Sequence, residues 1–173
     1  MINKGELFDA YDIDGHLLGY DLTRGQAIPE GVYHYIIEIY TFNVNCDLLV
    51  TKRHLNKFYP LYWEVTAGAV SKGETPKNAA IRELREETGL IINEQCLHQV
   101  GKEIDHHSII VSFLTKIPER NPVIELEENE TIDYQWIAYP DILEFIHRGD
   151  FVPTSSRRMT TYMKVINDLL TKV

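Results

Sequence analysis

Apolar positions along the chain follow two different periods, and together they predict a protein of mixed strands and helices. In several short runs, aromatic and β-branched residues alternate with polar ones or stand between turn residues, a pattern that is typical of strands. The strands predicted in this way span Glu6–Tyr11, Tyr33–Phe42, Cys46–Arg53, Trp63–Val70 (with a break at Gly68), Leu97–Ile104, Ser108–Lys116 and Thr131–Ala138.

Other segments carry the signals of helices. The central one has Thr75 as an N-cap, Pro76 at its first position and Gly89 as a left-handed stop after Thr88. Two further helices are predicted at Pro140–Arg148 and Ser155–Lys172. Because strands cluster before and after one central helix, the pattern favours an α+β sandwich over a regular βαβ winding.

Apolar residues in the last helix recur at helical spacing and predict a face that packs into the core, with a partner surface as the alternative. These residues are Met159, Met163, Ile166, Leu169 and Leu170.

Length and composition indicate one domain over residues 1–173, in which residues 1–31 form a turn-rich N-terminal extension. A formal net charge of −9 disfavours binding to nucleic acid. The first residues contain no long apolar run, so we expect neither a secretory signal nor a membrane span. Two isolated cysteines, Cys46 and Cys96, are expected to be reduced and buried in a cytoplasmic protein.

The central helix carries acids whose spacing indicates chemistry. Glu83, Glu86 and Glu87 lie three and four positions apart, so they share a helical face, where like charges repel. A hard cation such as Mg²⁺ or Mn²⁺ removes that conflict and also binds diphosphate oxygens. Gly68 lets a backbone carbonyl approach the helix, and Arg82 is placed to hold one of the acids by a forked hydrogen bond.

The whole segment resembles the Nudix box, Gly-x5-Glu-x7-Arg-Glu-hydrophobic-x-Glu-Glu-x-Gly-hydrophobic. Its fixed positions are filled by Gly68, Glu74, Arg82, Glu83, Leu84, Glu86, Glu87, Gly89 and Leu90. The resemblance implies a Nudix-like α/β/α sandwich with a mixed central sheet. It also implies Mg²⁺- or Mn²⁺-dependent hydrolysis of a nucleoside diphosphate derivative or another organic diphosphate.

Roles for single residues follow from the same resemblance. Glu86 and Glu87 resemble the principal metal ligands, and the carbonyl of Ala67 resembles the backbone ligand. Glu83 resembles a further ligand or the general base. Arg82, grouped with Glu83 and Glu86 in the catalytic set, resembles the residue that braces the loop against the helix.

Flanking residues resemble the isopentenyl-diphosphate-isomerase-like branch of the family. The similarity lies in Glu6-Leu-Phe-Asp, Gly31-x-Tyr-His34, Leu49-Val-Thr-Lys-Arg53 and Trp63. In that branch, basic residues that match Arg53 and Lys57 bind the substrate diphosphate; the alternative is that both are ordinary edge-strand charges.

The isomerase itself is a poorer match, because the stretch that would carry its catalytic cysteine reads Val65-Thr-Ala-Gly68 in this chain. We therefore predict a hydrolase, with an isomerase and a non-enzymatic nucleotide sensor as alternatives. The expected partner is a small-molecule diphosphate, and a homodimer is left open.

An acid outside the box is expected to complete the site. Glutamates cluster before the last predicted strand, and among them Glu128 and Glu130 are favoured. Trp63 and Trp136 are interpreted as core residues rather than stacking platforms for a base. The pair His106-His107 is interpreted as a solvated turn.

Overall fold

The computed structural model describes residues 5–172, so the first four residues of the predicted 1–31 extension and Val173 lie outside it. A seven-stranded mixed sheet forms its centre, in the order β5-β4-β3-β8-β7, with β6 paired to β3 and β9 paired to β4. β3 and β8 run parallel and the other pairs are antiparallel. The strands are β3 (His34–Phe42), β4 (Leu48–Arg53), β5 (Trp63–Glu64), β6 (Thr66–Ala69), β7 (His98–Asp105), β8 (Ser108–Lys116) and β9 (Thr131–Ile137).

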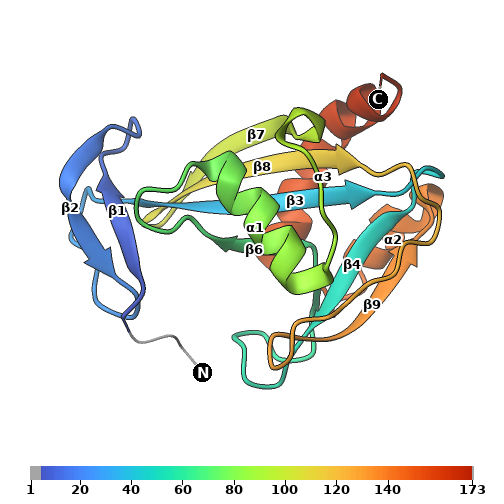
Figure 1. Ribbon diagram of the computed structural model, residues 1–173, viewed down its shortest axis with the longest axis horizontal. Helices are drawn as coiled ribbons and strands as arrows, with labels where there is room; N and C mark the ends of the chain where they lie inside the picture. The colour runs from blue at the N-terminus through green and yellow to red at the C-terminus, as the bar shows by residue number, and fades with distance from the viewer. Residues whose placement is uncertain (1–4, 173) are drawn as a thin grey trace.

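Helices cover the two faces of this sheet, which confirms the predicted α+β sandwich (Figure 1). Helix α1 (Pro76–Thr88) packs on β3 and β6, with Ala79, Ala80 and Leu84 buried against one half of the core. Helices α2 (Ile142–Ile146) and α3 (Pro153–Leu170) enclose the other half of the core. Short 3₁₀ turns span Glu94–Cys96 and Tyr139–Asp141, so the helix predicted from Pro140 starts as a 3₁₀ turn.

Strands β1 (Leu7–Tyr11) and β2 (Leu17–Thr23) form a separate two-stranded hairpin beside the main sheet, drawn in dark blue in Figure 1. The sequence predicted the first of these strands but not the second. Leu17, Leu18 and Tyr20 of β2 are exposed, so its apolar residues do not alternate between a buried and a solvated face. The usual signal of a half-buried strand is therefore missing.

The predicted strand break at Gly68 was wrong. The break falls at Val65, and Gly68 lies inside β6, in register with Ile37 of β3. A Cβ added at Gly68 would lie 2.1 Å from the Cδ atom of Glu83. The glycine is therefore required by the close approach of a carboxylate to the strand, and not by a change of chain direction.

The tryptophans and the apolar stripe of α3 are placed as predicted, but the cysteines are not. Both cysteines are free, but Cys96 is exposed and Cys46 is only half-buried, so the expectation that both are buried was wrong. Trp63 is a core residue, and Trp136 packs against the α1 side of the core. The apolar stripe of α3 packs into the core, as predicted. None of the described helices combines the length and the apolarity that a membrane crossing requires.

Candidate active site

Local sequence signals set the position of α1. The Thr75 side-chain oxygen accepts a hydrogen bond from the Asn78 amide at 3.2 Å, and Pro76 begins the helix. Gly89 ends it in a left-handed conformation at φ 73°, with its N–H donating to the Arg85 carbonyl at 2.9 Å. With the apolar face of α1 packed on the sheet, Glu83 and its acidic neighbours lie beside β6.

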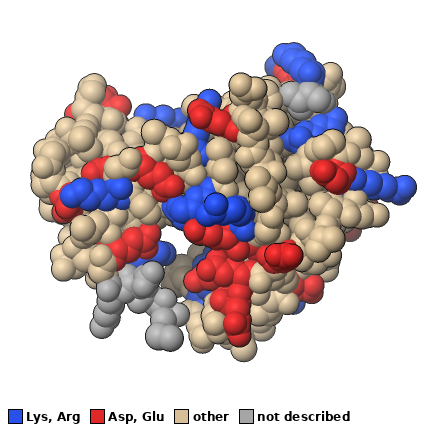
Figure 2. Space-filling model, viewed as in Figure 1, with Lys and Arg blue, Asp and Glu red and all other residues tan. Residues whose placement is uncertain are grey.

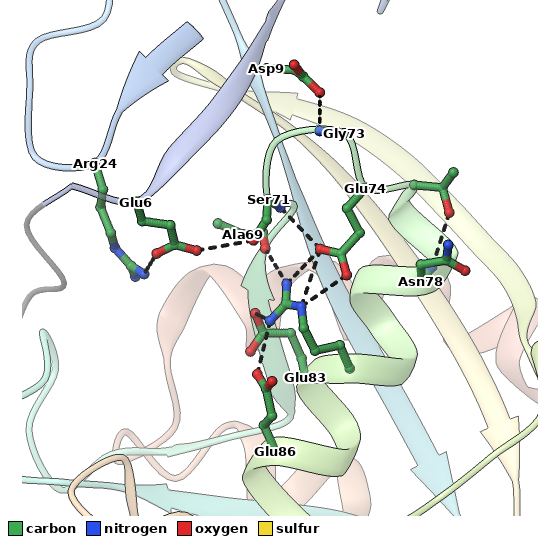
Figure 3. A network of polar contacts seen from close by, with 12 residues as sticks. Glu6, Asp9, Arg24, Ala69, Ser71, Gly73, Glu74, Asn78, Glu83 and Glu86 are labelled. Atoms are coloured by element: carbon green, nitrogen blue, oxygen red, sulfur yellow. Dashed lines mark hydrogen bonds and ion pairs between the residues drawn. The ribbon is translucent and has the colours of Figure 1, made fainter.

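Arg82 ties the loop before α1 to the acids on the helix (Figure 3). Its Nη2 donates to Glu74 Oε2 at 2.8 Å and to the Ala69 carbonyl at 3.1 Å, and its Nη1 donates to Glu83 Oε1 at 2.7 Å and to Glu86 Oε2 at 3.1 Å. The hydrogen bonds that Arg82 donates to Glu74, and the nearby charge of Glu83, raise the pKa of Arg82 against the opposing effect of burial, so it stays cationic. One guanidinium thus fixes three carboxylates and one strand carbonyl.

Glu87 is the most deeply buried acid of this helix, with 3% of its surface exposed. Its Oε1 is 3.8 Å from Lys57 Nζ, while its Oε2 is buried without a hydrogen-bond partner among the described residues. Burial, followed by the charge of Glu64, raises the pKa of Glu87 well above its ordinary value, while the charge of Lys57 and the side chain of Thr66 act in the opposite direction. An ionised Glu87 therefore requires a positive charge that the described side chains supply only in part.

Arg53 and Lys57, the predicted phosphate contacts, are brought together at this site by Glu64. Arg53 Nη1 forms a short ion pair with Glu64 Oε2, and Arg53 Nε donates to the Phe58 carbonyl at 2.7 Å. Lys57 Nζ is 3.7 Å from Glu64 and 2.8 Å from Glu130. Both cations are thus held at the end of β4 by carboxylates, rather than lying on an unpaired edge.

Glu64 is a site residue that the sequence interpretation missed. Its side chain is 8% exposed and contacts both predicted phosphate-binding cations. Burial raises its pKa, while the charges of Lys57 and Arg53 act in the opposite direction. The available signal was a lone charge within the apolar run Trp63-Glu64-Val65, because a charged residue is rarely buried unless it is paired.

Three of these cations, Arg53, Lys57 and Arg82, line a strongly polar pocket of about 280 Å³. Ala67 and Gly68 of β6 line it together with the acids of α1, and Glu127 and Glu130 line it from the loop before β9. Glu128, the other acid favoured from sequence, is not among the lining residues described. Figure 2 shows acidic side chains gathered below a basic patch near the middle of this face, beside a hollow.

The histidines noted in the sequence do not line the acidic pocket. His106 is in the tight turn between β7 and β8, with 93% of its side chain exposed, and His107 Nδ1 lies 3.0 Å from the Val32 carbonyl. Neither is among the residues that line the acidic pocket. His34 Nε2 lies 3.2 Å from the Ser108 hydroxyl, and its ring stacks on Phe8.

The pocket has the donor set that a hard divalent cation prefers. Glu83, Glu86 and Glu87 supply carboxylate oxygens, and Ala67 adds a backbone carbonyl at the pocket wall. The partnerless Oε2 of Glu87 fits this requirement, because a coordinated cation would satisfy it. The missing side chain at Gly68 fits it as well, since it admits the Glu83 carboxylate.

Comparison with known proteins identifies the family of the chain. The NUDIX domain model matches residues 33–157. An uncharacterized Nudix hydrolase from Listeria monocytogenes is 29% identical over 154 residues, which cover 86% of this chain and 89% of the relative. An isopentenyl-diphosphate Delta-isomerase from Shigella boydii is 28% identical over 144 residues, covering 72% of this chain and 79% of the isomerase.

Solved structures share the fold. The DR0079 protein of Deinococcus radiodurans superposes with a TM-score of 0.74 at 18% identity, covering 91% of this chain and 99% of that one. A bifunctional NMN adenylyltransferase/ADP ribose pyrophosphatase from Francisella tularensis, complexed with AMP and a Mn ion, gives a TM-score of 0.63 at 19% identity, covering 76% of this chain and 41% of that one. Because the family match spans more than half of the chain and includes the acidic helix, the chain belongs to the Nudix family.

Proposed function

We propose that this Nudix-type hydrolase cleaves the diphosphate linkage of a nucleoside diphosphate derivative or another small organic diphosphate, with Mg²⁺ or Mn²⁺ as cofactor. The observation that supports this most is Glu87, a buried acid whose Oε2 has no partner among the described residues, beside two further acids of α1. A buried carboxylate that its neighbours compensate only in part is suited to a cation that also binds phosphate oxygens.

The cation would be held by Glu83, Glu86, Glu87 and the Ala67 carbonyl, and when bound it supplies charge neutralisation on phosphate and a lower pKa for bound water. Glu83 then takes the proton of the attacking water. The water oxygen forms a bond to phosphorus while the bridging P–O bond breaks, and the electron pair of that bond leaves with the departing phosphate. Arg82 keeps the carboxylate of Glu83 beside β6 through the 2.7 Å hydrogen bond.

Lys57 and Arg53 orient the phosphates in this proposal. Lys57 Nζ lies 2.8 Å from Glu130 and within 4 Å of Glu64 and Glu87, so it already borders the acidic pocket. A substrate diphosphate would compete with these carboxylates for the ammonium group. The free cysteines agree with a reducing compartment, and we propose a cytoplasmic location for the enzyme.

The test is a screen of organic diphosphates with Mg²⁺ or Mn²⁺ that measures released phosphate or pyrophosphate. Glu86→Gln is expected to lower kcat/KM by roughly 100-fold or more, because a charge that acts on the transition state is lost. Glu128→Gln, which changes an acid outside the described pocket lining, is the matched control and should retain activity. Full metal-dependent hydrolysis by Glu86→Gln would contradict the assignment.

Isomerisation of isopentenyl diphosphate is the second candidate, favoured by the similarity to the Shigella boydii enzyme. Against it, neither Cys46 nor Cys96 is among the described residues of the acidic pocket, so the pocket shows no thiol for proton transfer. Incubation with isopentenyl diphosphate separates the two functions. Movement of the double bond without phosphate release indicates an isomerase, and no turnover of any diphosphate together with retained ligand binding indicates a sensor.

A further inference from the structure

A second recess, of about 350 Å³, adjoins the acidic pocket, between the β1–β2 hairpin and the main sheet. The two spaces share four of their lining residues, namely Arg24, Ala67, Gly68 and Ala69. A ligand whose charged end lies at the acids of α1 can therefore extend past β6 into this recess. Its volume lies within the range of about 300–1,000 Å³ that small-molecule sites occupy.

The walls of the recess differ in chemistry from those of the acidic pocket. Phe8 and Leu22 come from the hairpin, Ile28 from the segment that follows it, and Ile36 from β3. Phe8 stacks on His34, with ring centroids 5.1 Å apart and an interplanar angle of 20°.

Uncharged polar groups also line the recess, and the carboxylates of the acidic pocket are not among its described lining residues. Thr23 and Gln26 supply a hydroxyl and a side-chain amide, and Arg24 is the one Lys or Arg side chain among the described lining residues. Burial lowers the pKa of His34, which keeps its ring neutral near pH 7. The recess thus suits an uncharged ligand group with apolar faces and few polar edges.

We propose that this recess binds the uncharged organic group of the diphosphate substrate, so that the β1–β2 hairpin determines which diphosphates are accepted. This inference rests on the proposed hydrolase function and specifies its substrate end. A nucleobase and a prenyl chain share the required chemistry, since each presents apolar faces and carries no charge.

Arg24 lies at the boundary between the two spaces. Its Nη1 forms an ion pair with Glu6 Oε2 at 2.6 Å, and Glu6 Oε1 accepts a hydrogen bond from the Ser71 hydroxyl at 3.3 Å, next to the loop that Arg82 braces (Figure 3). The hairpin is thus tied by its charged end to the start of the Nudix box. In this proposal Arg24 contacts the substrate at the point where the phosphate joins the organic group. It is therefore expected to contribute to the binding of every diphosphate substrate.

The test compares variants that narrow the recess without changing the acids of α1. Gln26→Trp and Ile28→Trp each place a large ring on a wall of the recess. Leu18→Trp is the matched control, because Leu18 is an exposed residue of the same hairpin that does not line the recess. Circular dichroism and thermal unfolding establish that each variant is folded before kinetics are measured.

Three substrates serve as probes: a nucleoside diphosphate, dimethylallyl diphosphate and methyl diphosphate, whose organic group is too small to fill the recess. For whichever of the first two the wild type prefers, Gln26→Trp and Ile28→Trp are expected to raise KM about tenfold, as the loss of about 1.4 kcal/mol of binding would require. The KM for methyl diphosphate and all values for Leu18→Trp should stay unchanged. Arg24→Gln should raise KM for all three substrates.

The outcomes separate this inference from the proposed function. A wild type that hydrolyses no diphosphate contradicts the proposed function itself. A wild type that is active, with recess variants that leave KM unchanged or raise it equally for methyl diphosphate, overturns the recess as the site of the organic group. Preference for the nucleoside or for the prenyl substrate decides which of the two groups the recess accepts.

Discussion

Glu38 and Glu87 are both buried, at 0% and 3% exposure, but their surroundings differ completely. Glu38 Oε2 accepts a hydrogen bond from Arg158 Nε at 2.8 Å and one from the Tyr40 hydroxyl at 3.1 Å, while Oε1 accepts a short one from Ser155. Glu87 has Lys57 at 3.8 Å and one oxygen without a partner among the described residues.

The difference separates a buried charge that the fold compensates fully from one that, in the proposed function, a cation completes. Glu38 lies between the sheet and α3 with both oxygens bonded, so it needs nothing from outside the protein. Glu87 has Glu64 as a like-charged neighbour, and its burial is compensated only in part. Buried charges without full partners are costly, and they persist where a ligand completes them. Burial alone would not have distinguished these two acids.

The largest expected effect is on stability, from Glu38→Gln. The substitution leaves Arg158 buried with its principal anion removed, and breaking a buried pair in this way costs about 3–5 kcal/mol. Urea unfolding should show that loss, while the folded fraction keeps its metal-dependent hydrolysis. The double variant Glu38→Leu/Arg158→Met removes both charges and should recover most of the stability. A single variant as stable as the wild type would show that the Glu38 network does not hold α3 to the sheet.

Glu87→Gln should lower activity and not stability, the opposite of Glu38→Gln. We expect kcat/KM to fall by roughly 10²–10³-fold, while stability in a chelator stays equal or rises because a poorly compensated buried charge is removed. Initial rates measured with Mg²⁺ give the loss of activity, and thermal unfolding measured in a chelator gives the change in stability. Both measurements use the same protein preparation. If Glu87→Gln lost stability and kept its activity, Glu87 would belong with Glu38 among the structural acids.

Much of the acidic-helix part of the candidate site could be predicted from sequence, because its signals are local. The cap at Thr75, the stop at Gly89 and the i, i+3, i+4 spacing of the acids all lie within one helix and its ends. Spacing could place Glu83, Glu86 and Glu87 on one face before any tertiary contact was known. It could not show which of them would be buried, since that depends on β6 and on Lys57.

The rest of the site depends on contacts between distant segments. Glu64 meets Arg53 and Lys57 only because β4 and β5 pair, and a lone charge in a short apolar run gave little indication of this. Strand β2 was not predicted, because most of its apolar side chains are exposed and give no alternation of buried and solvated positions. Without that strand, the recess beside the acidic pocket could not be inferred. The choice between Glu127, Glu128 and Glu130 required the path of a loop that has no periodic pattern.

Stabilisation by a bound metal ion should also distinguish Glu38 from Glu87, with a smaller expected effect. Mg²⁺ at about 100 times its Kd should stabilise the wild type by about 2.7 kcal/mol, because it binds the folded state alone. Glu87→Gln should lose most of this stabilisation by Mg²⁺. Glu38→Gln should keep it, although its stability without metal is lower than that of the wild type. Paired urea titrations, with Mg²⁺ and with a chelator, measure the difference. An equal gain in all three proteins would place the cation away from Glu87.

The smallest expected effect is on the pH dependence of stability without metal. Burial and Glu64 raise the pKa of Glu87 in the folded protein above the ordinary value of 4.5, so between these two pKa values the folded state binds more protons than the unfolded state. Stability should then fall as pH rises from 4.5 through the folded pKa, by at most about 1.4 kcal/mol per pH unit for one proton. The pKa values of Glu64 and Glu83 are also raised, so the contribution of Glu87 is the difference between the wild type and Glu87→Gln in a chelator. Added Mg²⁺ should reduce that difference because it favours the ionised form. Identical slopes in the two proteins would mean that the buried carboxylate is compensated in the folded state without a cation, and the contrast with Glu38 would then rest on geometry alone.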